Sequence, residues 1–123
     1  MLNKTVALAI LLVYIGLITF LSLTTLDTHV DIKVDYGDKI VHIAIHAINV
    51  ILLYIVLIKY NSVKPILFAI IISVCYGILI EILQEKLTSA RQFDKFDIYA
   101  NCFGTIIAAV FLKIKGRAIV KLI

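Results

Sequence analysis

Four long apolar runs divide the chain, and short polar segments separate them. The runs cover residues 6–26, 40–58, 66–83 and 98–114. Each has close to the roughly 20 residues that a helix needs to cross about 30 Å of hydrocarbon. Pro65 stands just before the third run, and proline suits the first turn of a helix, where its missing N–H costs nothing. The pattern predicts an all-α protein, a four-helix transmembrane bundle that forms a single domain over residues 1–123.

The first run has an alternative interpretation as a cleaved signal peptide, because Lys4 precedes it. Its apolar core is longer than the roughly 7–15 residues of such a segment, and no A-x-A-like cleavage site follows. We therefore expect a retained span. The second run is interrupted by His42, His46 and Asn49, and the fourth run is the shortest and contains Asn101.

Composition supports a membrane protein. Of the 123 residues, 63% are hydrophobic and 16% are charged, whereas soluble domains have roughly 45–50% apolar and about 25% charged residues. This balance excludes an ordinary water-soluble protein. Both cysteines, Cys75 and Cys102, fall inside apolar runs, where a thiol packs as a small apolar group.

Charged residues separate between the two ends of the predicted bundle. Four spans place both termini and the turn near residues 59–64 at one face, with seven of the 12 basic residues and no acid. All eight acids lie at the other face, in or beside segments 27–39 and 84–97. The excess of Lys and Arg at the terminal face favours cytoplasmic termini. The net charge of +4 is therefore attributed to topology, and no nucleic-acid partner is expected.

Three of the predicted helices carry one polar stripe each, and all three stripes are strongest toward the acidic face. Residues three or four positions apart share one face of a helix. Polar groups that face lipid are costly, so the stripes are expected to point inward and pair. In the fourth helix, Gly104 and Ala108 form a small-xxx-small step that lets a neighbouring helix approach closely. The stripes are Asp38, His42, His46 and Asn49; Ser73, Gly77, Glu81 and Gln84; and Asp94, Asp97, Asn101, Gly104, Thr105 and Ala108.

The residues nearest the acidic face form the candidate site. Two roles stay open for them, a structural network that holds the helices together and a site for a ligand or a reaction. Glu81 is expected to be kept ionised by a cation, Arg91 or protonated His42. His46 and Asn49 lie deeper and are expected to form hydrogen bonds between helices. The predicted site residues are Asp38, Lys39, His42, Glu81, Gln84, Arg91, Asp97 and Asn101.

Two histidines and nearby acids also allow a metal site as an alternative. His42 and His46 are four residues apart, a spacing that can hold a metal, and Glu81 or Asp97 could complete the set. The chain has no HExxH motif, no GxSxG motif and no phosphate-binding loop. The sequence therefore predicts neither a metal nor a cofactor.

The polar positions resemble the VanZ-like family of small bacterial membrane proteins. The resemblance rests on DKIVH at residues 38–42, EILQ at 81–84, Arg91, and DIYANCFG at 97–104. It departs from the family at His46, where members often have an aromatic residue, and in lacking a proline soon after the first span. The resemblance implies a protein of the bacterial inner membrane and a link to resistance against the glycopeptide teicoplanin. The matching positions are Asp38, Lys39, His42, Glu81, Gln84, Arg91, Asp97, Asn101 and Gly104.

Three functions follow as hypotheses. The first is binding of a polar or anionic headgroup of a membrane lipid or a lipid-linked cell-wall precursor, with Arg91 and Lys39 holding the anion. The second is a membrane enzyme of group transfer that uses His42 as general base with Glu81 or Asp97. The third is a scaffold subunit of a membrane complex, in which the polar cluster is structural.

Overall fold

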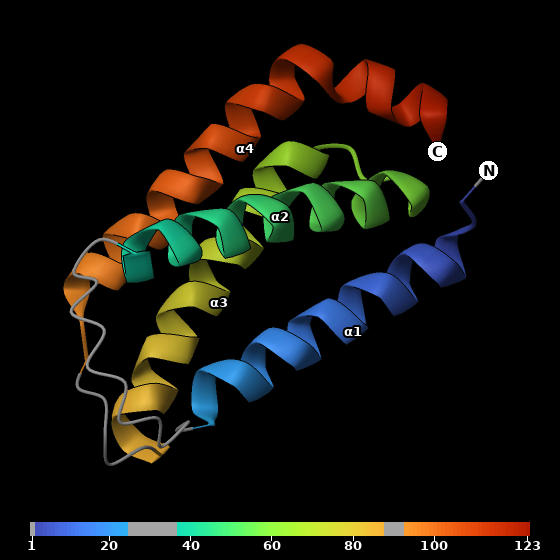
Figure 1. Ribbon diagram of the computed structural model, residues 1–123. Coiled ribbons are helices and arrows are strands. Elements are labelled where there is room, and N and C mark those ends of the chain that lie inside the picture. The colour runs from blue at the N-terminus through green and yellow to red at the C-terminus, as the bar shows by residue number, and fades with distance from the viewer. Residues whose placement is uncertain (1, 25–36, 88–92) are drawn as a thin grey trace.

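The computed structural model describes residues 2–24, 37–87 and 93–123, and these residues form four α-helices (Figure 1). The helices are α1 (Lys4–Leu23), α2 (Gly37–Lys59), α3 (Pro65–Leu87) and α4 (Lys95–Leu122). The all-α fold is thus confirmed. The first helix ends at Leu23, before the predicted residue 26, and the other three extend beyond their apolar runs. The largest difference is in α4, which continues eight residues past the predicted residue 114.

Local sequence explains where the helices begin. The Asn3 side chain caps α1 by accepting a hydrogen bond from the Val6 N–H at 2.8 Å, and Asp94 caps α4 by accepting one from the Phe96 N–H at 2.8 Å. Short polar side chains at this position satisfy amide groups that have no partner within the helix. The third helix begins at Pro65, as predicted.

The other three helices are packed around α2, which contacts α1, α3 and α4. Figure 1 shows the two termini close together at one end of the bundle. The Leu2 N–H donates a hydrogen bond to the Ile123 carbonyl at 2.7 Å, and Lys59 Nζ at the end of α2 donates to the same oxygen at 2.9 Å. The opposite end therefore brings together the beginnings of α2 and α4 and the end of α3.

The interior changes character from one end of the bundle to the other. Toward the termini it is apolar, with Leu11, Val50, Leu53, Ala69 and Leu112 among its buried residues. Toward the other end, polar side chains from α2, α3 and α4 are buried beside the apolar Ile80 and Ala100. The buried polar residues are His46, Asn49, Ser73, Glu81, Gln84, Asp97, Asn101 and Thr105.

The outer surface carries many large apolar side chains, among them Val13, Phe20, Phe96, Phe103 and Ile106, each more than half exposed. Three helices, α1, α2 and α3, are long and apolar enough to cross a membrane. This agrees with a membrane protein, while the fourth span stays a prediction. Charges at Asp97 and, near the other end, at Lys113, Lys115, Arg117 and Lys121 make α4 the least apolar helix.

Helices α4 and α2 approach each other closely at Gly104. A Cβ atom placed on Gly104 would stand 2.1 Å from the carbonyl oxygen of Ile43. Only a residue without a side chain fits there, because the obstacle is backbone. The predicted close approach at Gly104 is confirmed, and it sets the separation of α2 and α4 at the site.

Candidate functional site

The predicted site residues meet at the end of the bundle opposite the termini. Asp38, Lys39 and His42 lie in the first two turns of α2, Glu81 and Gln84 near the end of α3, and Asp97 and Asn101 at the start of α4. Arg91 lies outside the described residues. The stripes predicted from helical spacing therefore do face one another across three helices.

Lys39 joins α2 to the start of α4 through two carboxylates. Its Nζ lies 2.6 Å from Asp94 Oδ2 and is also paired with Asp97 Oδ1. The Asp97 side chain is 7% exposed, and that of Asp94 is 39% exposed. The Lys39 ammonium beside Asp94 holds the pKa of that carboxyl below its usual range. Asp38 Oδ2 also lies 3.9 Å from Lys39 Nζ, so three acids surround this ammonium. That Lys39 holds an anionic ligand stays a prediction.

His42 is fixed by a hydrogen bond to α4. Its Nδ1 lies 2.9 Å from Asn101 Oδ1, and an amide oxygen can only accept, so Nδ1 carries the hydrogen. The other ring nitrogen, Nε2, lies 3.6 Å from Asp97 Oδ2 and 3.9 Å from Asp38 Oδ1. Asn101 thus holds the ring so that Nε2 faces two carboxylates.

Glu81 lies in the interior of the bundle and is 1% exposed. Among the described residues its Oε1 has no hydrogen-bond partner. The carboxyl lies beside the backbone N–H of Asp94 and within electrostatic reach of Asp97 and His42. The predicted pairing of Glu81 with Arg91 falls on a residue outside the described part and stays a prediction.

A second, neutral network lies deeper in the bundle. His46 Nδ1 is 3.1 Å from Ser73 Oγ, and Asn49 Nδ2 donates to the same oxygen at 3.3 Å. Ser73 Oγ in turn lies 3.4 Å from Thr105 Oγ1. The prediction that His46 and Asn49 form hydrogen bonds between helices is confirmed.

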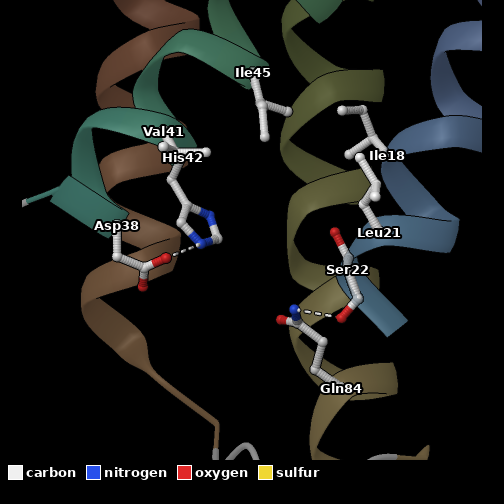
Figure 2. A pocket seen from close by; sticks show the side chains of 8 residues that line it. All are labelled: Ile18, Leu21, Ser22, Asp38, Val41, His42, Ile45 and Gln84. Carbon is white, nitrogen blue, oxygen red and sulfur yellow. Dashed lines mark hydrogen bonds and ion pairs between the residues drawn. The ribbon is translucent and has the colours of Figure 1, made fainter. Parts of the chain in front are cut away.

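A pocket of about 180 Å³ opens beside the charged residues, between α1, α2 and α3. Figure 2 shows His42 and Asp38 on one side and Gln84 on the other, where Gln84 Nε2 donates to the Ser22 carbonyl at 3.0 Å. Apolar side chains complete the walls, so the pocket has both a polar and an apolar lining. It is lined by Ile18, Leu21, Ser22, Asp38, Val41, His42, Ile45 and Gln84.

The contribution of α1 to this region was missed from the sequence. Tyr14 donates from its hydroxyl to the Ile45 carbonyl at 2.8 Å, and Thr19 Oγ1 lies 3.1 Å from the Tyr76 hydroxyl. The signal was present as hydroxyl side chains within the first apolar run, because such groups seek partners when they leave water. The hydrogen bond that the Ser22 carbonyl accepts from Gln84 could not be predicted from the sequence, since every residue has a backbone carbonyl.

Comparison with protein-family models, with curated proteins and with solved structures gives no match.

Proposed function

We propose that this chain is a multi-pass protein of the bacterial inner membrane with four spans and both termini in the cytoplasm. The three long apolar helices support a membrane location. The hydrogen bond between Leu2 and Ile123 places both termini at one end of the bundle, which suits an even number of crossings. The terminal end also carries the excess of basic residues, as the positive-inside rule expects of a cytoplasmic face.

We also propose membership of the VanZ-like family. The support is spatial, because residues that carry the resemblance interact although they are far apart in the sequence. Lys39 pairs with Asp97, and His42 pairs with Asn101, across nearly 60 positions of the chain. A link to teicoplanin resistance follows as part of the same proposal and is tested by antibiotic susceptibility with and without the protein.

The function that the geometry supports best is binding of the polar head of a membrane amphiphile, such as a lipid or a lipid-linked cell-wall precursor. The observation that carries this proposal is the pocket with two kinds of lining. Asp38 and His42 offer hydrogen-bonding groups, whereas Val41 and Ile45 offer an apolar wall. An amphiphile has the same division between a polar head and an apolar chain.

The charged side chains around the pocket indicate which kind of polar headgroup it would bind. Lys39, which was expected to hold an anion, is shared by Asp94 and Asp97. Asp38 is the charged group on the pocket wall, and a carboxylate accepts hydrogen bonds. The protein groups themselves therefore favour a head rich in hydroxyl or amine donors over a bare anion.

Filling the pocket tests the proposal. Ile45→Trp places a large ring in the pocket, and Ile106→Trp is the matched control because Ile106 lies on α4 and is 58% exposed. Lipids that remain with the purified protein are measured by native mass spectrometry. We expect Ile45→Trp to reduce the retained amphiphile at least tenfold and Ile106→Trp to leave it unchanged. Equal retention by both folded variants would refute binding in this pocket.

A second candidate, an enzyme of group transfer, is favoured by the fixed orientation of His42. A general base needs a held ring and an adjacent carboxylate, and Asn101 and Asp97 supply them. His42→Gln separates the candidates, because an enzyme then loses turnover while the amphiphile is still retained. In the scaffold alternative, the same substitution lowers stability or association with a protein partner and changes neither retention nor turnover.

A further inference from the structure

Three potential metal ligands converge beside the pocket from two helices. Asp38 and His42 stand four residues apart on α2, and Asp97 comes from α4. One ligand atom from each lies within 4.8 Å of the other two. We propose that these residues bind a divalent transition-metal ion of the zinc class. The inference rests on this geometry and does not depend on the headgroup proposal.

The distances fit a shared ion better than direct hydrogen bonds. His42 Nε2 lies 3.6 Å from Asp97 Oδ2 and 3.9 Å from Asp38 Oδ1, both beyond the usual hydrogen-bond range. Zinc bonds to imidazole nitrogen and carboxylate oxygen are about 2.1 Å long, so two ligands in a tetrahedron lie about 3.4 Å apart. The two His42 distances need to shorten by a few tenths of an ångström, and the ligand oxygens of Asp38 and Asp97, which lie within 4.8 Å of each other, must approach by up to about 1.4 Å to close the set around one ion.

The state of the His42 ring supports the same conclusion. Its Nδ1 donates to Asn101 Oδ1 at 2.9 Å, which leaves Nε2 as the ring nitrogen that can bind a metal ion. Nε2 faces the carboxylates of Asp38 and Asp97, so a single ion can contact all three side chains. The Lys39 ammonium also pairs with both carboxylates, from their other oxygens. Metal-bound histidines commonly have their second ring nitrogen held in this way, because the bond fixes the tautomer and the direction of the ligand.

An independent observation comes from Glu81, which belongs to α3. It is 1% exposed, its Oε1 has no hydrogen-bond partner among the described residues, and it lies within electrostatic reach of Asp97 and His42. A buried carboxylate oxygen without a partner is costly. A divalent cation at the neighbouring ligands would offset the negative charge that Lys39 alone leaves uncompensated. Glu81 then acts as an outer carboxylate rather than as a ligand.

The ion would be reachable from the pocket. Asp38 and His42 are pocket-lining residues, so the fourth position of a tetrahedral ion has room on that side. Sites with three protein ligands and one open position are typical of zinc that binds a water or a ligand group. Such an ion would also attract phosphate or carboxylate oxygens that the acidic side chains repel.

The test measures metal binding by the full chain in detergent, purified without a polyhistidine tag and stripped by a chelator. Zn²⁺ is titrated by calorimetry, and Co²⁺ serves as an absorbance probe of coordination. We expect one equivalent of Zn²⁺ and a Co²⁺ spectrum of four-coordinate intensity. Asp38→Asn should weaken Zn²⁺ binding at least tenfold, and because the Asp38 side chain is 47% exposed, this variant should still fold. His42→Gln should weaken it further.

Glu85→Gln is the matched control, since Glu85 is an exposed carboxylate on the last turn of α3. It should bind Zn²⁺ as the wild type does. Failure of the wild type to bind a stoichiometric ion would overturn the proposal. So would equal loss of binding in Glu85→Gln and Asp38→Asn, which would show general attraction to acids. Circular dichroism of each variant confirms that altered binding is not altered folding.

Discussion

Substitution of Gly104 offers the sharpest test of how α2 and α4 pack. In Gly104→Ala the new methyl group would stand 2.1 Å from the Ile43 carbonyl oxygen and 2.9 Å from the Ile43 carbonyl carbon. Ordinary contact for such an atom begins at 3.4 Å. Both obstacles are backbone atoms, so no rotamer change relieves the clash. The two helices must separate by about 1 Å in a closely packed interior.

The cost follows from that separation. Overpacking typically costs about 1–3 kcal/mol, and a clash with backbone belongs at the upper end. Moving α4 also weakens the hydrogen bond between His42 and Asn101, worth about 1 kcal/mol. Replacing glycine by alanine in a helix returns about 1 kcal/mol. We expect a net loss of about 3 kcal/mol in the free energy of unfolding.

Gly16→Ala is the matched control, because nothing lies within 4 Å of a Cβ atom at Gly16. It should leave stability unchanged or raise it by up to about 1 kcal/mol. The assay is reversible unfolding in mixed micelles with increasing dodecyl sulfate, followed by circular dichroism. If Gly104→Ala unfolds at the same dodecyl sulfate fraction as Gly16→Ala, the close approach of α2 and α4 is refuted.

Two further predictions concern the charges, and a third concerns the topology. Lys39→Met should lower the free energy of unfolding by about 3 kcal/mol, because it leaves buried Asp97 without its cation. The double variant Lys39→Met/Asp97→Asn should recover part of this stability. A Lys39→Met variant as stable as the wild type would contradict the prediction. The lowered pKa of Asp94 means that its contribution to stability is complete above its ordinary pKa of 3.8 and is lost as pH falls below it. Acid titration of unfolding should therefore destabilise the wild type more than Asp94→Asn, and parallel curves would contradict the pairing. In a background without native cysteines, a cysteine at position 31 should react with an impermeant maleimide from outside and one at Ser62 should not; the reverse pattern would invert the proposed topology.

The sequence predicted the helices well and their ends less well. An apolar run predicts the part of a helix that lies in lipid. The helix can continue beyond that run into the polar interface, as long as the residues there have a reasonable helix propensity. In α4 the eight residues after Ile114 have no proline, and Gly116 is tolerated because it packs against the Tyr54 hydroxyl, 2.5 Å from where its Cβ would stand. A hydropathy profile does not contain contacts between distant residues, so it could not predict where α4 ends.

The sequence predicted which residues lie at the candidate site, but it did not predict which of them pair with one another. Helical spacing places His42 and Asn101 on inward faces, because a period of 3.6 residues fixes direction around the helix. It does not fix the relative height of two helices, so it could not show that Lys39 meets Asp94 and Asp97. That height is set by the contact of Gly104 with Ile43, which only the packed structure reveals.

The order of polar groups along α2 explains why chemistry is expected at His42. The deepest residues, Asn49 and His46, are 1% and 4% exposed, and their partner Ser73 is neutral. Along the described part of α2, the charged residues Asp38 and Lys39 lie in its first turn and Lys59 at its end, because a charge costs more to bury than a neutral polar group does. His42 stands at the boundary, with neutral Asn101 on one ring nitrogen and carboxylates facing the other. A ligand that enters from the end opposite the termini would therefore reach the fixed ring of His42 first, and beyond it the buried hydrogen-bond network of His46, Asn49 and Ser73.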